Sequence, residues 1–281
     1  MKIKIARTPL FVPLLALLAS LAINIPIFAA SEMQANKLVL TGSSTVAPLM
    51  EEIGKAFEAK HPGVHVDVQS GGSGRGINDA RSQAVDIGMV SRALKDDEKD
   101  LTAYKIALDG VCIILNQKNS VKVLSDKQVV DIYTGKITNW KDAGGKDAPI
   151  TVINKAEGRS TLELFCHYYK IKNEDIKASV VIGENEQGIK TVAGNPNAIG
   201  YVSIGTAEYD ASGGVAIKLL ATNGVPASIE NVKNGIFPLA RPLNLVTKTA
   251  ANGLVKQLID FAQSKDVWSI IKELYFVPIA K

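Results

Sequence analysis

The sequence predicts an α/β protein in which a largely parallel sheet is covered by helices. Three times in succession a short strand pattern leads through a loop into a segment with helical spacing, and these strand patterns lie at 37–40, 64–68 and 86–90. Alternation of this kind is typical of parallel sheets with helices on their faces. Ligands of such sheets bind beyond the carboxyl ends of the strands, where all three loops should emerge. With 281 residues, the chain is long enough for one large or two moderate domains.

A glycine-rich loop at 70–77, with the sequence Ser-Gly-Gly-Ser-Gly-Arg-Gly-Ile, connects the second strand to the helix that follows. Glycine allows a tight backbone turn and a close approach of a ligand to the main chain. The start of a helix offers free N–H groups and a partial positive charge, which together favour an anion. Ser73 adds a hydroxyl group and Arg75 adds a charged, forked donor. The spacing matches neither a Walker loop nor a Rossmann fingerprint, so a flexible turn without a ligand is the alternative.

Three further loops place hydroxyl groups at helix starts, and two of them also carry arginine. These loops are Ser43-Ser44-Thr45, Ser91-Arg92 and Arg159-Ser160-Thr161. Together with the glycine-rich loop, they could surround a compact oxyanion with donors from two sides. Each loop also has a simpler interpretation. Ser44 or Thr45 could cap the following helix, Ser160 with Glu163 has the spacing of a capping box, and the arginines could be ordinary surface residues.

The rest of the chain also alternates between strand and helix patterns. Apolar strands at 105–108 and 111–115 are expected on either side of a turn at Asp109-Gly110. Further strands are expected at 150–153, 180–182, 199–202, 217–219 and 243–246. Helices are expected at 46–57, 77–84, near 129–133, at 162–169 and across most of 250–274. Because the composition becomes more polar after Asn116, a second lobe should begin near that residue.

Residues 1–30 have the features of an export signal. A basic start is followed by an apolar run at 10–29, and the small pair Ala29-Ala30 indicates cleavage before Ser31. The alternative is an uncleaved membrane anchor, because the run is nearly long enough to span a bilayer. The only charges in residues 1–30 are three basic ones, so removal of this segment would lower the net charge from +4 to +1. This small value argues against a nucleic-acid-binding protein.

The sequence contains no arrangement of residues that favours catalysis. Cys112 lies in a buried-strand pattern and Cys166 in a helical segment, and we expect free thiols, although an export compartment would permit a disulfide. The histidines at 61, 65 and 167 lack metal-ligand spacing. Cys166 and His167 are adjacent on a helix and therefore point in different directions. There is no Gly-x-Ser-x-Gly elbow. We expect a binding protein with no catalytic residues, no cofactor and no metal.

In six stretches the sequence resembles the periplasmic phosphate-binding proteins that serve ABC-type phosphate importers. The stretches lie at 42–49, 70–77, 85–92, 106–110, 135–140 and 156–161, and they extend in order over nearly all of the chain after residue 36. The resemblance implies a two-lobed periplasmic binding protein of type II, with parallel-rich sheets, flanking helices and a hinge of two crossing strands near 112–118 and 239–247. Lobe 1 would comprise 36–115 with 240–281, and lobe 2 would comprise 116–239.

The resemblance also implies a set of phosphate-binding residues. Carried over by motif, these are Ser44, Thr45, Val46, Ser73, Gly74, Arg75, Ser91, Arg92, Arg159, Ser160 and Thr161. Their hydroxyl groups, main-chain N–H groups and guanidinium groups would replace the water shell of the anion as two lobes close on it.

Departures from the pattern of the family leave the choice of anion open. Some members have aspartate at the position of Ser91, Ser-Gly-Thr at 159–161 and arginine at the position of Lys155. That aspartate accepts the proton of hydrogen phosphate and thereby rejects sulfate. Glu157 and Asp86 are the candidate acceptors in this chain.

The resemblance implies delivery of phosphate to the permease subunits of an ABC transporter, in the periplasm and without chemistry on the ligand. We expect a monomer without a nucleic-acid partner. Sulfate, molybdate or tungstate are alternative ligands. A secreted phosphatase is a further alternative, which would require a nucleophile with a base or paired metals. A sensory protein whose cleft binds no anion is the last alternative.

Overall fold

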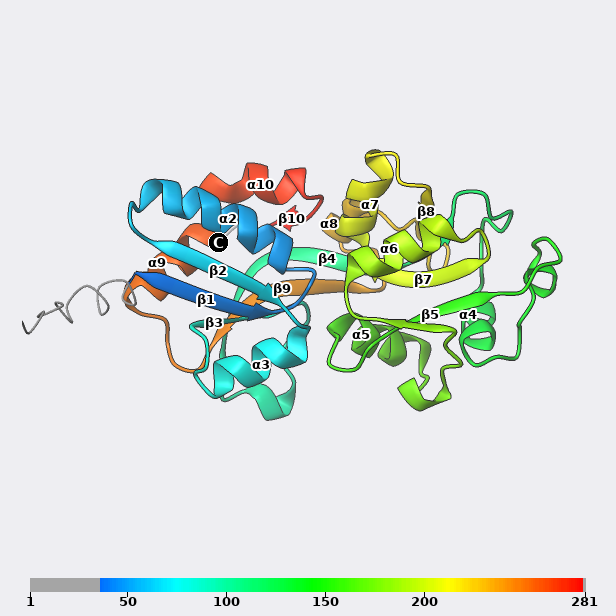
Figure 1. The fold of residues 1–281 in the computed structure, drawn as a ribbon, viewed down its shortest axis with the longest axis horizontal. Coiled ribbons are helices and arrows are strands. Elements are labelled where there is room, and N and C mark those ends of the chain that lie inside the picture. Colours follow the sequence, from blue (N-terminus) through cyan, green and yellow to red (C-terminus); the bar gives the residue numbers. More distant parts are fainter. Residues whose placement is uncertain (1–35, 280–281) are drawn as a thin grey trace, which may run out of the picture. The chain divides into compact units, whose positions relative to one another are not determined.

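The computed structural model describes residues 36–279, so the expected export signal at 1–30 lies outside the described residues (Figure 1). The strands are β1 Lys37–Gly42, β2 His65–Ser70, β3 Ile87–Val90, β4 Thr102–Asn116, β5 Thr151–Lys155, β6 Val180–Ile182, β7 Ala198–Ser203, β8 Ile217–Leu219, β9 Ala240–Thr247 and β10 Val277–Pro278. The α-helices are α2 Ala47–Lys60, α3 Ser73–Arg81, α4 Asp126–Tyr133, α5 Ser160–Tyr169, α6 Asn185–Gly194, α7 Ile204–Ser212, α8 Ile229–Lys233, α9 Gly253–Ala262 and α10 Trp268–Glu273. Short 3₁₀ turns lie at Asp96–Glu98, Trp140–Ala143, Asn173–Asp175 and Lys265–Val267.

The strands join in the order β2-β1-β3-β9-β4-β7-β5-β6, and β8 and β10 also pair with β4. Pairing is parallel towards both ends, where β1 joins β2 and β3, and β5 joins β6 and β7. In the middle, β9 runs antiparallel to β3 and β4, and β4 runs antiparallel to β7. The α/β prediction is therefore confirmed. The carboxyl ends of β1, β2 and β3 lead into the three predicted serine-bearing loops, as expected.

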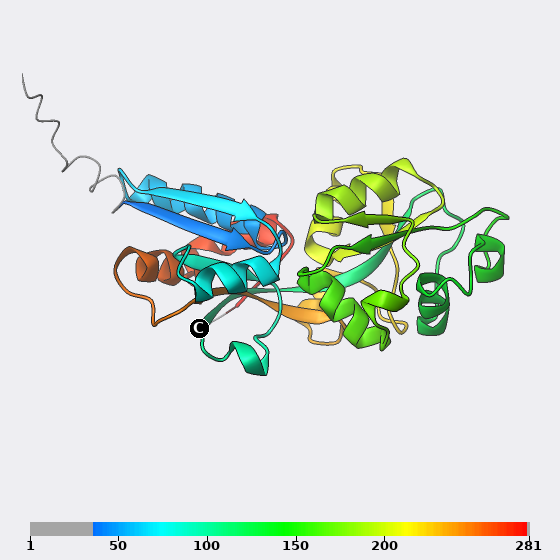
Figure 2. The same ribbon diagram turned by 60° about the horizontal axis from the view of Figure 1, so that its bottom comes forward.

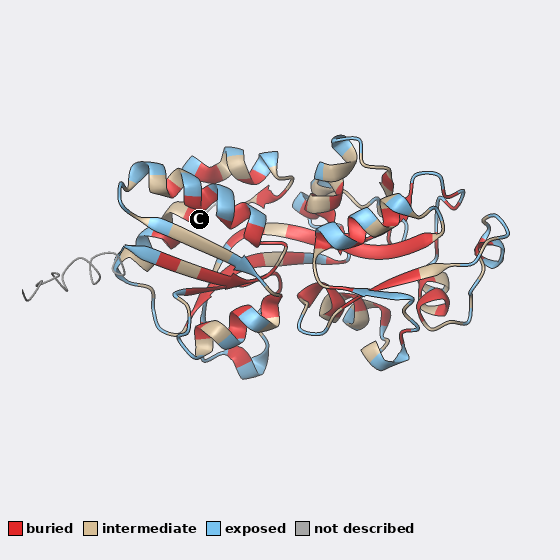
Figure 3. Ribbon diagram, viewed as in Figure 1, coloured by how far each residue is buried: buried red, intermediate tan, exposed pale blue. Residues whose placement is uncertain are grey.

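Apolar side chains form two large buried clusters. The paired strands β4 and β9 run between the elements that carry these clusters (Figures 1 and 2). The first cluster draws on 38–57, on β3 and on 243–276, and α2, α9 and α10 cover it. The second cluster draws mainly on 111–239. Because β4 contributes Ala107 to the first cluster and Val111 to the second, the chain passes between them at 108–110. Figure 3 shows that β9 is mainly buried, whereas β4 is exposed at its start and mainly buried from Ile106 to Asn116.

The predicted turn at Asp109-Gly110 is wrong, because β4 continues through these residues from Thr102 to Asn116. Gly110 pairs with Ala240 of β9, and Asp109 pairs with Arg241. An Asp-Gly pair favours a turn when its polar side chain faces solvent. Here the Asp109 carboxylate is buried and lies 2.9 Å from a guanidinium nitrogen of Arg241. The ion pair therefore satisfies the carboxylate within the sheet, and the strand does not need to turn.

Glycines bring α3 into direct contact with the backbone of β1 and β3. A Cβ atom on Gly76 would lie 2.7 Å from the carbonyl oxygen of Met89, and one on Gly88 would overlap the carbonyl oxygen of Gly76. Gly42, at the end of β1, has a φ of 135° and also faces Met89. No larger side chain fits at these positions without moving the backbone. The close packing places the first turn of α3 directly beyond the ends of the strands.

Both cysteines are free thiols, Cys112 buried and Cys166 half-buried. Burial raises the pKa of both thiols. Within residues 36–279, no helix combines the length and the apolar character needed to cross a membrane.

Candidate functional site

The four predicted loops meet around one small cavity. Its wall consists of Ser43, Ser44, Thr45, Gly72, Ser73, Ser91, Lys155, Arg159, Ser160, Thr161 and Gly183. Hydroxyl groups and two cationic side chains thus dominate the wall, which contains no acidic residue. The cavity measures about 10 Å³, close to the roughly 10–15 Å³ that one water requires. It is this small because the hydroxyl groups contact one another across it.

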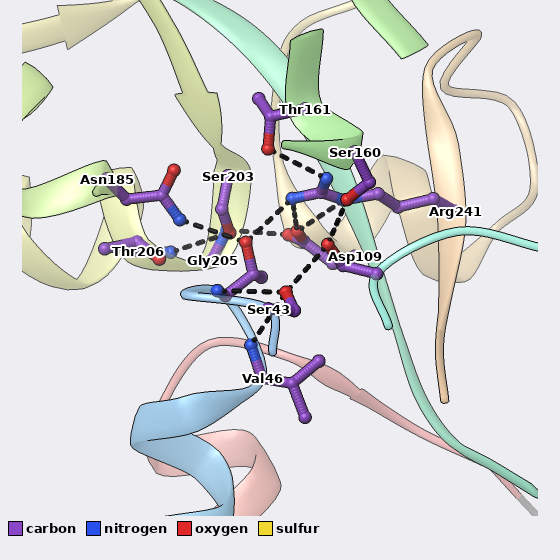
Figure 4. A network of polar contacts seen from close by, with 12 residues as sticks. Ser43, Val46, Asp109, Ser160, Thr161, Asn185, Ser203, Gly205, Thr206 and Arg241 are labelled. Carbon is purple, nitrogen blue, oxygen red and sulfur yellow. Dashed lines mark hydrogen bonds and ion pairs between the residues drawn. The ribbon is translucent and has the colours of Figure 1, made fainter. Parts of the chain in front are cut away.

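A chain of hydroxyl groups in the cavity wall joins the four loops; its members Ser43 and Ser160 are labelled in Figure 4. Ser43 Oγ donates to Ser91 Oγ at 2.8 Å. The Oγ atoms of Ser91 and Ser160 lie 2.5 Å apart, and Ser73 Oγ donates to Ser160 Oγ at 3.0 Å. A hydroxyl group can donate or accept, so each of these bonds can be exchanged for a bond to an oxyanion. The network therefore provides several donors at one point.

Most of these hydroxyl groups are not used for helix capping. The N-cap of α3 is Gly72, and that of α5 is Arg159, neither with a side-chain capping bond. The capping box expected from Ser160 and Glu163 is therefore absent. At α2 the N-cap residue is Val46, and the only capping-type contacts come from Ser43, whose Oγ accepts from the N–H groups of residues 45 and 46 at 3.2 and 3.4 Å. The helix starts consequently leave the hydroxyls of residues 73, 160 and 161 facing the cavity.

Lys155 is a cationic residue of the cavity wall that the sequence analysis did not assign to the site. It ends β5, its side chain is 2% exposed, and its Nζ donates to Asn185 Oδ1 at 3.0 Å. Burial lowers the pKa of Lys155 from 10.5 to about 7, with Arg241 and Arg159 acting in the same direction and Glu184 opposing them. An ammonium group in this position gains strongly from an anion in the cavity, because water does not compensate its charge.

Arg241 is a second buried cation near the cavity that sequence reasoning missed. It lies on β9, is 3% exposed, and its Nη1 and Nη2 donate to Thr161 Oγ1 and Thr45 Oγ1, both at 3.1 Å. Nε and Nη2 also donate to Asp109 Oδ2, at 3.1 and 2.9 Å. Asp109 and Arg241 each interrupt an apolar strand pattern. A charge in such a position requires a buried partner. This requirement could have identified Asp109 and Arg241 as a pair from the sequence.

Arg75 and Gly74 do not serve the cavity in the predicted way. The guanidinium of Arg75 is exposed and donates to Asp79 Oδ2 at 3.1 Å and to the Ser70 carbonyl at 3.1 Å. The nearby carboxylate one helical turn away holds this arginine on the outer face of α3. The N–H of Gly74 donates to the Gly158 carbonyl at 2.9 Å, which ties the glycine-rich loop to the loop before α5. Neither residue lines the cavity.

Arg92 and Val46 also lie outside the cavity wall. Arg92 is buried, and its two Nη atoms donate to the carboxylate of Glu98 at 2.6 and 2.8 Å. Its Nε lies 2.8 Å from Glu163 Oε2 on α5, and Lys95 Nζ lies 2.9 Å from the same oxygen. In this structure the guanidinium thus faces two acids, and Arg92 does not line the cavity. The N–H of Val46 is directed at the carbonyl of Ser43, at 3.1 Å.

Neither candidate proton acceptor lies at the cavity. Asp86 precedes β3, at the opposite end of that strand, and its Oδ2 accepts from the Val39 N–H at 2.8 Å. Glu157 accepts from Asn173 Nδ2 at 3.3 Å in an exposed position. Glu184 pairs with a residue of the wall, since its Oε1 lies 2.8 Å from Arg159 Nη1, but it does not line the cavity. The serine hydroxyls are therefore the acceptors that the wall offers to a protonated oxygen.

Comparisons with known proteins identify the family of the chain. A model of the PBP superfamily domain matches residues 29–266. The chain is 29% identical to the phosphate-binding protein PstS of Bacillus subtilis over 253 residues, which cover 88% of this chain and 82% of that protein. Among solved structures, that of a phosphate ABC transporter substrate-binding protein from Clostridium perfringens, with bound phosphate, is 34% identical. Its TM-score is 0.80, over 87% of this chain and 100% of that one. An ABC-type phosphate transport receptor from Vibrio cholerae has a TM-score of 0.70 and 28% identity, over 86% and 100% of the two chains.

Proposed function

The chain belongs to the PBP superfamily, as a protein of the PstS type, and on this premise we propose that it captures inorganic phosphate in the cavity between the four loops and delivers it to an ABC transporter. One observation carries the proposal. Four hydroxyl-bearing loops and the cations Lys155 and Arg159 converge on a cavity with no acid in its wall. A wall with this composition attracts an oxyanion, because it contains no acidic side chain that would repel one.

Binding would replace contacts that the wall makes with itself. The bonds that Ser160 makes with Ser73 and Ser91 would open, and the same hydroxyls would donate to phosphate oxygens. Ser73 and Ser91 follow strands of the first cluster, while Ser160 starts a helix of the second. An anion held from both sides stabilises the closed arrangement, since only there do all the donors reach it.

The two buried clusters support a division into two lobes. We assign 36–115 with 240–281 to lobe 1 and 116–239 to lobe 2. The passage of β4 between the clusters at 108–110, opposite the start of β9, supports a hinge crossing a few residues before the expected 112–118. The cavity would then be an inter-lobe cleft, and the chain would act as a periplasmic monomer without catalytic activity.

Arg159 and Arg75 provide a matched pair of substitutions that tests the site. Arg159→Ala should weaken phosphate binding at least tenfold, because this guanidinium lines the cavity and a charged hydrogen bond contributes roughly 1.5–3 kcal/mol. Arg75→Ala should change the affinity less than about twofold, since Arg75 is held on the outside of α3 by Asp79. Isothermal titration calorimetry measures both. Equal effects of the two substitutions would contradict the assignment of the cavity.

The identity of the anion is tested separately. Ion chromatography of anions released from the purified protein should detect phosphate, and sulfate, molybdate or tungstate should compete with it only weakly. A stronger response to one of these would reassign the ligand without changing the site. Hydrolysis of a chromogenic phosphate ester would instead favour the enzyme alternative.

A further inference from the structure

The buried ion pair at the crossing of β4 and β9 has a second role beyond holding the strands together. Asp109 and Arg241 are register partners, exposed by 0% and 3%. Both oxygens of the carboxylate have partners, because Oδ2 accepts from Arg241 and Oδ1 accepts from the Gly205 N–H at 3.1 Å (Figure 4). The pair carries no net charge. Because the carboxylate accepts only from Nε and Nη2, the guanidinium retains donors that Asp109 does not occupy.

Those remaining donors are directed at two hydroxyl groups of the cavity wall. Nη1 donates to Thr161 Oγ1 and Nη2 donates to Thr45 Oγ1. A guanidinium has no acceptor, so neither threonine can donate its hydrogen to Arg241. Thr45 Oγ1 also accepts from Asn185 Nδ2 at 3.0 Å, which occupies both of its lone pairs. The Thr45 hydroxyl can therefore form a further hydrogen bond only as a donor.

We propose that Arg241, held by Asp109, is a positioning residue that fixes the Thr45 and Thr161 hydroxyls as donors towards the bound anion. Arg241 itself is not part of the cavity wall. Thr45 precedes α2 over the first cluster, and Thr161 lies in α5 over the second. A single guanidinium on the hinge strand therefore aligns one donor from each side. The inference rests on the proposed function and identifies which hydroxyls always face unprotonated oxygens of the ligand.

The serine hydroxyls, unlike those of the two threonines, can either donate to the ligand or accept from it. Within residues 36–279, the hydroxyls of Ser91 and Ser160 bond only to other serine hydroxyls, so the hydrogen in the bond between them can reverse direction. The protonated oxygen of hydrogen phosphate would accordingly face the serines, which can accept, and the fully deprotonated oxygens would face the threonines.

A thermodynamic cycle tests the proposal. The paired variant Asp109→Leu/Arg241→Met removes both charges together, which leaves no unpaired buried charge and does not change the net charge near the anion. Thr161→Val is measured by calorimetry with inorganic phosphate in the natural chain and in the paired variant. In the natural chain it should weaken binding about tenfold or more, as expected for a hydrogen bond to a charged group. In the paired variant, where the hydroxyl is no longer oriented, it should weaken binding less than about threefold.

Ser160→Ala is the matched control in the same two backgrounds. Ser160 makes no hydrogen bond with Arg241, so its loss should cost the same factor in both. Equal factors for Thr161→Val in both backgrounds would overturn the positioning role. If the paired variant does not fold, Arg241→Lys replaces it in the cycle, since an ammonium keeps the charge opposite Asp109 but cannot present the planar fork. If the natural chain binds no oxyanion at all, the proposed function itself fails. This result is distinct from equal factors for Thr161→Val in the two backgrounds, which would contradict only the positioning role.

Discussion

Replacement of Lys155 by methionine should nearly abolish phosphate binding and, at the same time, stabilise the phosphate-free protein. The side chain is 2% exposed and has one hydrogen-bond partner, Asn185 Oδ1. Without an anion, Glu184 compensates the charge of the buried ammonium only in part, which is costly. With a phosphate dianion in the cavity, the same charge becomes a strong attraction in a poorly solvated site. We expect an affinity loss of roughly a hundredfold or more, as for a charge-assisted hydrogen bond at the upper end of its range.

The same lysine predicts how stability depends on pH. Burial lowers the pKa of Lys155 to about 7 in the folded protein, against an ordinary value of 10.5. Between these values the unfolded chain binds a proton that the folded chain does not, so the free energy of unfolding should rise with pH, by up to about 1.4 kcal/mol per pH unit from this group. Below pH 7 both states are protonated and this contribution is constant.

Phosphate affinity should follow the opposite trend. Above pH 7 the lysine is mainly neutral in the free protein, and binding of the dianion must take up a proton, so affinity should fall as pH rises from about 8 to about 10. Lys155→Met should flatten both dependences. Urea unfolding across this range and calorimetry in buffers of different ionisation enthalpy measure them. Lys172→Met, at an exposed lysine paired with Glu174, is the control and should preserve both slopes.

Alanine at Gly88 should destabilise the protein by about 3 kcal/mol or more, the upper range for overpacking of a well-packed site. A Cβ atom here would overlap the carbonyl oxygen of Gly76 and lie 2.8 Å from Val246 Cγ2. Because the first of these is backbone, α3 would have to move away from the sheet. Ser73 begins α3 and lines the cavity, so phosphate affinity should fall together with stability.

Gly194→Ala is the matched control for this substitution. Gly194 ends α6, and an added Cβ would meet no atom within 4 Å. Alanine loses less conformational freedom on folding than glycine does. The free energy of unfolding, measured with urea, should therefore change by less than about 1 kcal/mol, in the stabilising direction. A Gly88→Ala protein as stable as Gly194→Ala would show that α3 does not depend on this contact.

The sequence was sufficient to predict β1 to β3, the helices α2 to α5 and the four loops, because each depends on local patterns of apolar, glycine and hydroxyl residues. The helices α6, α7 and α8 were not predicted. The predicted cavity wall includes Ser44, Thr45 and Ser73, which local sequence places at strand ends. The sequence was not sufficient to predict which arginine lines the cavity. Whether a guanidinium faces a ligand depends on which acid lies nearest, and Arg92 meets Glu98 and Glu163 only in the folded chain.

Residues paired over long sequence separations were also not predictable. Asp109 and Arg241 are 132 positions apart, and each alone is a polar interruption of an apolar strand. Asp109-Gly110 even favours a turn on local grounds, and only the pairing of β4 with β9 overrides this preference. Lys155 likewise joins the site through Asn185, which lies 30 positions away.

The contacts of Gly74 with Gly158, and of Glu163 with Arg92 and Lys95, involve no group of the proposed ligand. They nevertheless join elements of the first cluster to elements of the second, and they must break before the cavity can open. Under the proposed function, the residence time of phosphate would be governed by atoms that never touch it. Unloading would then accelerate when a transporter pulls these few bonds apart, even if its own surface never reaches the anion.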